Sequence, residues 1–481
     1  MKIRPEKRLS PVLKRLSSMD AMEFVRWFPA QGISQICAVL LSVMAVLPIV
    51  ISLIYQDPLE NVDYVVTNWE RELSNLYALG PLWYHALLFL GFPLGLIAAL
   101  LCAKRIDAGK PRVSLSPKAW KSYLLPIGLL LMLLWSVPSA LLSGNIQICF
   151  LGDGGRHEGV VTYFFYALVF IGAIQISEKH MKWVVEILCA TCAFTGILAC
   201  THGQIFQGIF YVDMNPRAAM FHNGNHYGYY LAICLPVCFG LCMEEQGRGI
   251  FRYMIRALEF WLICNAVVFC SCRGSFLAVT AAMIGWNISV FIQHKDKWKK
   301  CLAWDIIFVM TILVMNTENN PLQRMSELAV EMEVIQQENN TDALGNGRGI
   351  LWRYGIQFAL ERPLFGYGPD NLRYLYSAVQ PGLSDRPHNE FIQFAASLGF
   401  PALAFYLVAI GGHVATFFCN FRRLSLFQLA LFASVGSYLV SSIFGNTMYN
   451  TTPYYIMMLA FSYRVCNPKE TQVCATEIAS L

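Results

Sequence analysis

Histidine and arginine side chains gather in one polar stretch of an otherwise apolar chain. Residues 317–387 contain six arginines but neither lysine nor cysteine, and they lead directly into His388-Asn389-Glu390. An imidazole can take a proton near neutral pH, and a guanidinium pairs two-pronged with phosphate or carboxylate. If the chain has a chemical site, these residue types predict that it lies here and binds an anion.

The rest of the chain has the composition of a membrane protein. Of its 481 residues, 56% are hydrophobic and 14% are charged, and the mean hydropathy is +0.47. A soluble domain of this composition would expose large apolar patches to water. We therefore expect an all-α polytopic membrane protein built as one helical bundle rather than several soluble domains.

Apolar runs long enough to cross a bilayer recur along the chain and predict about 12 transmembrane helices. They lie near 33–55, 81–103, 122–143, 159–177, 183–200, 226–243, 257–272, 274–293, 301–316, 390–418, 425–445 and 454–466. The resulting regions are a basic cytoplasmic N-terminus (1–32), a membrane bundle of about nine transmembrane helices (33–316), a polar loop (317–389), C-terminal transmembrane helices (390–466) and a cytoplasmic tail (467–481).

The polar loop has helical patterns of its own. They predict one helix over 321–338, a second from Arg348 to Glu361 that Pro363 ends, and a third through Ala378 that Asp370 or Asn371 caps. Between the last two lies the turn Gly366-Tyr367-Gly368-Pro369. No strand precedes this Gly-x-Gly, so it does not indicate a nucleotide site.

Basic residues set the expected orientation, because loops rich in lysine and arginine stay cytoplasmic. With a cytoplasmic N-terminus and a retained first segment, every lysine lies inside and both termini are cytoplasmic. The outer side then receives ten basic residues, all arginine: Arg71, Arg156, Arg217, Arg273, Arg324, Arg348, Arg353, Arg362, Arg373 and Arg386. The polar loop is therefore predicted to be extracytoplasmic.

The outer arginines have two interpretations. The topology rule accounts for the missing lysines, and some arginines are expected to pair with Glu327, Glu331, Glu333 or Asp385. Arginines kept on the outer side nevertheless favour an anionic ligand there.

The cysteines are interpreted as packing residues. Most of the 16 lie in apolar segments, where cysteine behaves as a small hydrophobic side chain. The spacing Cys189-x-x-Cys192 has no histidine nearby, so neither a zinc site nor a disulfide framework is predicted.

Two runs in and after the polar loop carry a family resemblance. The run NGRGILWRYGIQFALERPLFGYGPDNL, followed by HNEFIQFAASLGFPALAFYL, resembles the shared domain of the bacterial O-antigen ligase and polysaccharide polymerase family. Weaker matches upstream are Arg156-His157-Glu158-Gly159, Asn223-Gly224-Asn225-His226-Tyr227-Gly228 and Ser271-Cys272-Arg273-Gly274-Ser275. The resemblance spans about residues 150–445.

This resemblance implies a GT-C-like integral membrane glycosyltransferase of the bacterial cytoplasmic membrane. Its expected reaction transfers a glycan from an undecaprenyl pyrophosphate carrier to an acceptor sugar or lipid-linked glycan on the outer side. The implied partners are that donor, a glycan or lipid acceptor and the bilayer, with no nucleic acid. No cofactor and no metal ion are expected, and arginines would neutralise the leaving pyrophosphate.

The resemblance also implies roles for individual residues. His388 is the candidate general base, and Arg348 and Arg273 are the other catalytic candidates. The candidate substrate-binding residues are Arg217, Asn225, Asn389, Trp352 and Arg156.

Each role has a structural alternative. His388 and Asn389 could cap the following helix, Arg273 could snorkel at a helix end, and Arg348 could pair with Glu331 or Asp342. Arg217 is equally plausible as loop structure.

Other functions stay open. A polymerase of the same family would use the same donor and differ only in its acceptor. A transporter or flippase would place ionisable groups near the bilayer midplane, whereas Glu186, Glu259, Asp305 and His413 lie nearer the cytoplasmic helix ends. A non-catalytic assembly scaffold is the third alternative.

Overall fold

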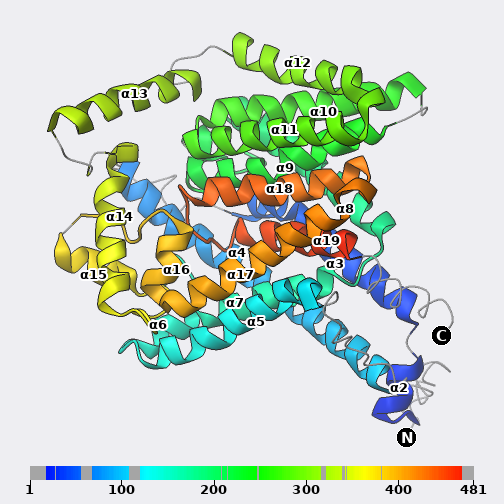
Figure 1. Cartoon of the computed structure of the whole chain (residues 1–481), viewed down its shortest axis with the longest axis horizontal. Coiled ribbons are helices and arrows are strands. Elements are labelled where there is room, and N and C mark those ends of the chain that lie inside the picture. The colour runs from blue at the N-terminus through cyan, green and yellow to red at the C-terminus, as the bar shows by residue number, and fades with distance from the viewer. Residues whose placement is uncertain are drawn as a thin grey trace, which may run out of the picture.

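The chain forms a bundle of helices. The computed structural model describes residues 18–27, 29–55, 68–107, 120–206, 208–213, 215–245, 249–315, 321–338, 342, 344–380 and 382–467. Every long regular element in these residues is an α-helix (Figure 1). The ends of the predicted terminal regions, residues 1–17 and 468–481, lie outside the described residues.

The described residues contain eighteen α-helices. The first half comprises α2 (Ala21–Trp27), α3 (Ala30–Ile54), α4 (Asn68–Asp107), α5 (Trp120–Leu141), α6 (Ile146–Leu151), α7 (Val160–Ala173), α8 (Glu178–Cys200) and α9 (Gly224–Glu244). The second half comprises α10 (Gly249–Cys270), α11 (Arg273–Gln293), α12 (Trp298–Val314), α13 (Pro321–Glu338), α14 (Leu344–Glu361), α15 (Leu372–Val379), α16 (Glu390–Leu398), α17 (Phe400–Asn420), α18 (Leu426–Ser442) and α19 (Thr452–Cys466).

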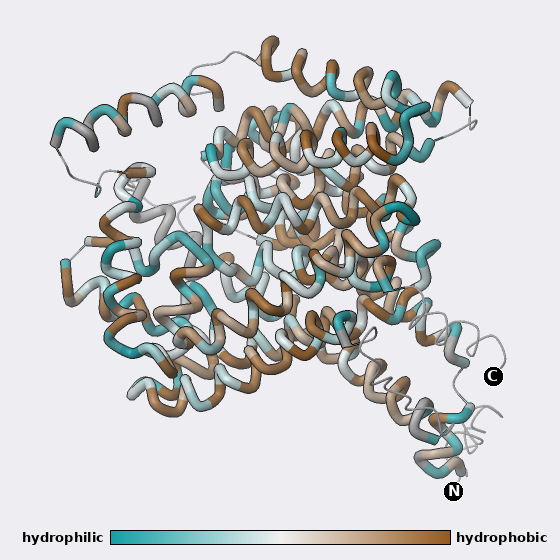
Figure 2. Tube along the Cα trace, in the orientation of Figure 1, coloured by the Kyte–Doolittle hydropathy of each residue, from teal (hydrophilic) through white to brown (hydrophobic). Residues whose placement is uncertain are grey.

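Length and apolar composition identify the membrane-spanning part. Among the described residues, 8 helices are long and apolar enough to cross a membrane, namely α3, α4, α5, α8, α9, α10, α11 and α17. Helices α7 and α18 are apolar but shorter, and Figure 2 shows how the apolar residues concentrate in the bundle. Each predicted segment falls largely on helical residues, so the chain is a helical polytopic membrane protein; the count of about 12 spans stays a prediction.

Several predicted segments differ in their bounds from the observed helices; α4, for example, begins at Asn68 rather than near 81. The segment predicted over 390–418 is two helices, because Gly399 has φ +85° and ends α16. A Cβ at Gly399 would lie 2.1 Å from the Leu364 carbonyl oxygen. Helix α10 begins at Gly249, earlier than the predicted start at 257, and it includes Arg256, whose charge is paired with Glu259 and Glu186.

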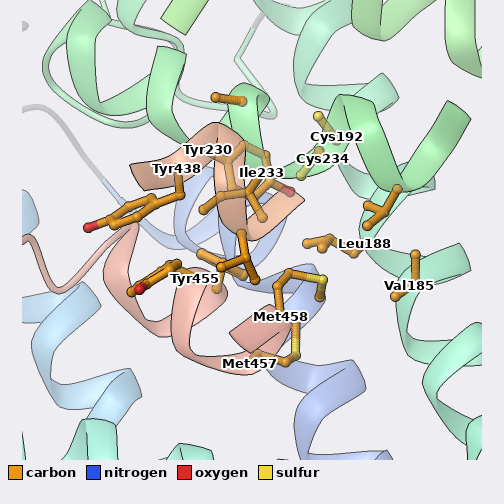
Figure 3. Packing of buried hydrophobic residues seen from close by; sticks show 14 of the residues in the cluster. Val185, Leu188, Cys192, Tyr230, Ile233, Cys234, Tyr438, Tyr455, Met457 and Met458 are labelled. Atoms are coloured by element: carbon orange, nitrogen blue, oxygen red, sulfur yellow. The ribbon is translucent and has the colours of Figure 1, made fainter. Parts of the chain in front are cut away.

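Helix α9 lies at the centre and is buried along its length. It packs against α8, α10, α11 and α18. Figure 3 shows Cys192 of α8 beside Cys234 of α9, with Tyr438 and Tyr455 on the other side of the same cluster. Cys192 and Cys234 are free and fully buried among apolar side chains, which agrees with their interpretation as packing residues.

The bundle has two chemically different ends. At one end, which we call the lysine end, Lys182 contacts Glu244 (2.6 Å) and Lys300 donates to the Glu245 carbonyl (2.6 Å). The opposite end, which we call the arginine end, carries Arg156, Arg217, Arg273, Arg348 and His388. This separation is the one that the basic-residue pattern predicts, and the side that faces the cytoplasm stays a prediction.

Helices α13, α14 and α15 form the described part of the polar loop at the arginine end (Figure 1). Helix α13 has the predicted bounds, α14 begins four residues before Arg348 at Leu344, and α15 follows Asn371 as expected. The Asn371 side chain does not cap α15 and instead donates to the Tyr367 carbonyl (2.8 Å). Leu351, Phe358 and Tyr376 pack with Ala395 and Ala396 of α16 in a second core, which fixes α14 relative to His388.

Candidate active site

His388 lies immediately before α16 and has a left-handed backbone with φ +51°. The next residue, Asn389, is the N-cap of α16: its Oδ1 accepts from the backbone N–H groups of Phe391 (3.0 Å) and Ile392 (3.1 Å). The cap expected of this pair is therefore supplied by Asn389. The ring of His388 is directed elsewhere, with Nε2 at 2.7 Å from Ser384 Oγ and Nδ1 at 3.0 Å from Asn446 Nδ2.

The surroundings of His388 keep its imidazole neutral. Burial, followed by the charge of the nearby Arg348 guanidinium, lowers the pKa of His388 to about 3, although the Asp385 carboxylate acts in the opposite direction. A neutral imidazole retains a lone pair at physiological pH, which a general base requires.

Arg348 has no carboxylate partner among the described residues. Its two expected partners are engaged elsewhere: Glu331 pairs with Arg273, and Asp342 pairs with Arg353 at 2.8 and 3.1 Å. A half-buried guanidinium beside a neutral histidine is a favourable position for an anionic group of a substrate.

Arg273 begins α11 and contacts Glu331 of α13, with Nη1 at 2.8 Å from Oε1. Glu331 Oε2 also accepts from the backbone N–H of Gly345 (3.0 Å), three residues before Arg348. Both side chains of the Arg273–Glu331 pair are 19% exposed. Glu331 thereby links α11, α13 and the start of α14.

The upstream candidates lie beside the start of α11. A Cβ at Gly224 would be 3.5 Å from the Arg217 carbonyl oxygen and 3.8 Å from that of Cys270. Asn225 Oδ1 accepts from Cys272 Sγ at 3.3 Å. The structure thus places the Arg217 backbone and Asn225 next to the segment that carries Arg273.

Phe444, in the loop between α18 and α19, connects α11 to α14. A Cβ at Gly274 would lie 3.2 Å from the Phe444 Cβ, and the Phe444 ring lies 6.4 Å from the ring of Trp352, one turn after Arg348. Arg273 and Arg348 therefore flank the same loop that supplies Asn446 to His388.

A network of buried charged side chains lies near His388. Arg156 pairs with Asp385 through two contacts of 2.7 and 3.1 Å, and Arg386 reaches both Asp385 and Asp370. Asp370 also accepts from the backbone N–H groups of Asp153 (2.7 Å) and Glu158 (3.0 Å). Burial acts to raise the pKa of Asp385, but the two arginines outweigh it and hold this pKa well below its usual range.

Part of the chain matches a known protein family. Residues 258–407 match the family model described as O-antigen ligase. Over this range the chain is similar to O-antigen ligases. No match is found among curated proteins. The resemblance stated from the sequence is confirmed for this range, which is narrower than the predicted 150–445.

The O-antigen ligase domain contains some of the candidate residues and not others. Arg273, Arg348, Trp352, His388 and Asn389 lie within the matched range. Arg156, Arg217 and Asn225 lie before it, and Asn446 after it. The chain is a helical multi-pass membrane protein, and the candidate residues come from the matched range and from the chain on both sides of it.

Sequence reasoning expected Asp385 to pair with an arginine, as it does, but it did not connect Asp385, Ser384, Asp370 or Asn446 with His388. Ser384 and Asp385 stand within four residues of His388, a proximity that could have singled them out. Asn446 is 58 residues away from His388, and no local pattern connects the two. Among the described residues, no three His, Cys, Asp or Glu side chains converge as metal ligands.

Non-glycine residues with a left-handed backbone concentrate near this site. All seven found among the described residues lie in loops at the arginine end: His157, His202, Ala219, His222, Ser271, Asp370 and His388. Such backbone conformations cost about 1–3 kcal/mol each unless the side chain tolerates them, as aspartate and histidine partly do. The surrounding contacts must therefore hold these loops in place.

The turn Gly366-Tyr367-Gly368-Pro369 fixes α14 and α15 to α16. The backbone N–H groups of Tyr367 and Gly368 donate to the carbonyls of Ala396 (3.0 Å) and Ser397 (2.8 Å) at the end of α16. Gly366 has φ +61°, and a Cβ there would lie 2.4 Å from the Ser397 carbonyl carbon. Only glycine fits this position.

We expect Gly366→Ala to destabilise the ligase domain, because it combines a left-handed backbone penalty of about 1–2 kcal/mol with a backbone clash. Thermal unfolding in detergent measures the effect. Gly382→Ala is the matched control. Gly382 also has a left-handed backbone, with φ +88°, but no atom lies within 4 Å of an added Cβ there. Equal melting temperatures for the two variants would contradict the close packing of the turn on α16.

Proposed function

We propose that this protein is a membrane glycosyltransferase of the O-antigen ligase type. It transfers a glycan from an undecaprenyl pyrophosphate carrier to an acceptor sugar or lipid-linked glycan on the outer side of the cytoplasmic membrane. The observation that carries this proposal is the pair formed by Arg348, which has no carboxylate partner among the described residues, and the neutral His388 beside it.

The proposed reaction needs a base and a group that neutralises negative charge. An acceptor hydroxyl oxygen forms a bond to the anomeric carbon while the bond from that carbon to the pyrophosphate oxygen breaks. The hydroxyl proton passes to His388, and undecaprenyl pyrophosphate leaves with the electron pair. Arg348 and Arg273 stabilise the charge that develops on this leaving group, and no metal ion is required.

The other candidates support these groups in the proposal. Arg156 is held by Asp385 in two contacts, so it acts through the network near His388. Asn389 fixes the start of α16 and hence the position of His388. Arg217, Asn225 and Trp352 line the approach from α9 and α14, where they bind donor phosphate or sugar.

An apolar cavity next to the site fits a lipid-linked substrate. Its volume is about 280 Å³, and side chains of α5, α7, α17 and α19 line it. Glu390 and Thr447 also line this cavity; Glu390 follows His388 by two residues, and Thr447 follows Asn446 directly. A hydrocarbon chain in this cavity would have its polar end near His388.

The test is a transfer assay with purified protein in lipid vesicles, an undecaprenyl pyrophosphate-linked glycan and candidate acceptors, in the presence of EDTA. A ligase gives a single added glycan and releases undecaprenyl pyrophosphate, whereas a polymerase gives a ladder of products. The proposal would be refuted if the donor is not consumed with any acceptor, or if the glycan is transported but not transferred.

Glu331 forms an ion pair with Arg273 in the structure, so donor pyrophosphate must compete with this carboxylate for the guanidinium. We expect Glu331→Gln to lower the donor KM by up to about 5-fold with little change in kcat, because an ion pair of this exposure is worth up to about 1 kcal/mol. Glu333→Gln on the same helix is the control, as its side chain is exposed and bonds to Gln337. A higher donor KM in Glu331→Gln would instead assign Glu331 to holding α13 in place.

A further inference from the structure

Two side chains on either side of His388 decide which ring nitrogen can act as the base. Ser384 Oγ lies 2.7 Å from Nε2, and the Asn446 amide lies 3.0 Å from Nδ1. A neutral imidazole carries one N–H and one lone pair, so the hydrogen-bonding group at one nitrogen fixes the role of the other.

The Asn446 side-chain amide can place either its nitrogen or its oxygen next to His388 Nδ1. If its nitrogen donates to Nδ1, then Nε2 carries the hydrogen and His388 has no free lone pair. In that arrangement Asn446 Oδ1 is buried without a hydrogen-bond partner among the described residues. A half-turn of the amide gives this oxygen the Nδ1–H as its donor and leaves the Nε2 lone pair facing the Ser384 hydroxyl.

We propose that Asn446 holds His388 in the tautomer protonated on Nδ1, and that Ser384 relays the acceptor proton to Nε2. This inference rests on the proposed glycosyl transfer and adds two residues to it. Ser384 and Asn446 approach the ring from different parts of the chain: Ser384 from the loop before α16, and Asn446 from the loop between α18 and α19.

The relay step balances as follows. The acceptor hydroxyl gives its proton to Ser384 Oγ while the original Ser384 proton passes to His388 Nε2. The acceptor oxygen forms its bond to the anomeric carbon, and the bond from that carbon to pyrophosphate breaks. Ser384 ends unchanged, and the imidazolium of His388 keeps its Nδ1–H bonded to Asn446 Oδ1 and later loses its proton to water.

Several charged groups surround His388, and they come from different elements. They are Arg348 of α14, Asp385 and Arg386 of the preceding loop, Arg156 of the loop between α6 and α7, and the titratable His226 of α9. Asn446 is uncharged, so a change at this position to aspartate adds one negative charge directly at Nδ1 without a change of shape.

Nuclear magnetic resonance tests the tautomer without any substrate. Protein labelled with ¹⁵N in its histidine rings gives distinct signals for the two tautomers, and the His388 signal is the one lost in His388→Gln. We expect the Nδ1–H form in the wild-type protein and a mixture in Asn446→Leu. An Nε2–H form in the wild-type protein would overturn the proposal.

The pH dependence of kcat tests the same role of Asn446 beside His388. We expect Asn446→Asp to remain active and to move the acid limb of its kcat profile upward by about 1–3 pH units, because a carboxylate beside an imidazole stabilises the charged form. An unshifted Asn446→Asp profile would overturn the role of Asn446.

The serine has a matched pair of variants. We expect Ser384→Ala to lower kcat by about 10–100-fold with an unchanged donor KM, and Ser384→Thr, which keeps the hydroxyl, to stay within about 3-fold of wild type. Wild-type kcat in Ser384→Ala would remove the relay. If the wild-type protein transfers no glycan at all, the proposed function fails, while the tautomer measurement still decides whether Asn446 sets the state of His388.

Discussion

His388→Ala is expected to abolish glycan transfer while the protein stays folded and inserted in the membrane. The variant removes the group that takes the acceptor proton, and proton transfer by a positioned side chain contributes about 10²–10⁴-fold to a rate. Folding should survive because α16 is capped by Asn389 rather than by His388. Transfer to acceptor is measured in vesicles, and the elution profile and melting temperature report the fold.

A matched histidine separates the loss of a base from a general effect of the substitution. His294 lies at the lysine end, between α11 and α12, so His294→Ala should transfer glycan at the wild-type rate. Retained transfer in His388→Ala would remove His388 from the chemistry.

The pH profile gives a second readout of the same group. Because the folded-state pKa of His388 is lowered to about 3 from 6.5, the imidazole stays neutral as the pH falls through 6.5 and is lost as a base only at lower pH. The acid limb of kcat/KM, which reports the free enzyme, should therefore lie well below pH 6.5. Bound pyrophosphate adds negative charge near Arg348, so the acid limb of kcat should lie at higher pH than that of kcat/KM.

Local sequence patterns predicted the helices well because they depend on residues close together in the chain. Helix α13 has the predicted bounds, and α14 ends before Pro363 as expected. The break at Gly399 was missed because a single glycine in an apolar run resembles a continuous helix. The Leu364 carbonyl, from a turn distant in sequence, lies where a Cβ at Gly399 would be, so only tertiary structure shows why this position is glycine.

The site was predicted only in part, because residues far apart in the sequence form it. The composition of the polar loop and the family resemblance singled out His388 and Arg348. Which carboxylate pairs with which arginine, however, depends on tertiary structure: Glu331 and Asp342 were the alternative partners expected for Arg348, but they contact Arg273 and Arg353. The Arg156–Asp385 pair spans 229 residues, and no periodicity in a single sequence encodes such a distance.

Arg348→Lys is expected to lower transfer by about 100-fold or more, although the charge is kept. Removing one fixed donor to a developing anion typically costs about 10²–10³-fold in kcat. Lysine offers a point charge on a flexible stem, whereas the planar guanidinium can bind two phosphate oxygens at once. Because Arg348 makes no ion pair with a carboxylate among the described residues, the substitution should leave the fold intact.

The same change elsewhere on α14 distinguishes two-pronged binding from a general effect of lysine. Arg353 is 52% exposed and pairs with Asp342 outside the site, so Arg353→Lys should keep the wild-type rate and melting temperature. If Arg348 acts only through its charge, Arg348→Lys will also keep the rate, and the leaving pyrophosphate must then be stabilised elsewhere, with Arg273 as the remaining candidate. If Arg348→Lys loses kcat while the donor KM is unchanged, the guanidinium acts mainly in the transition state, where the pyrophosphate charge is greatest.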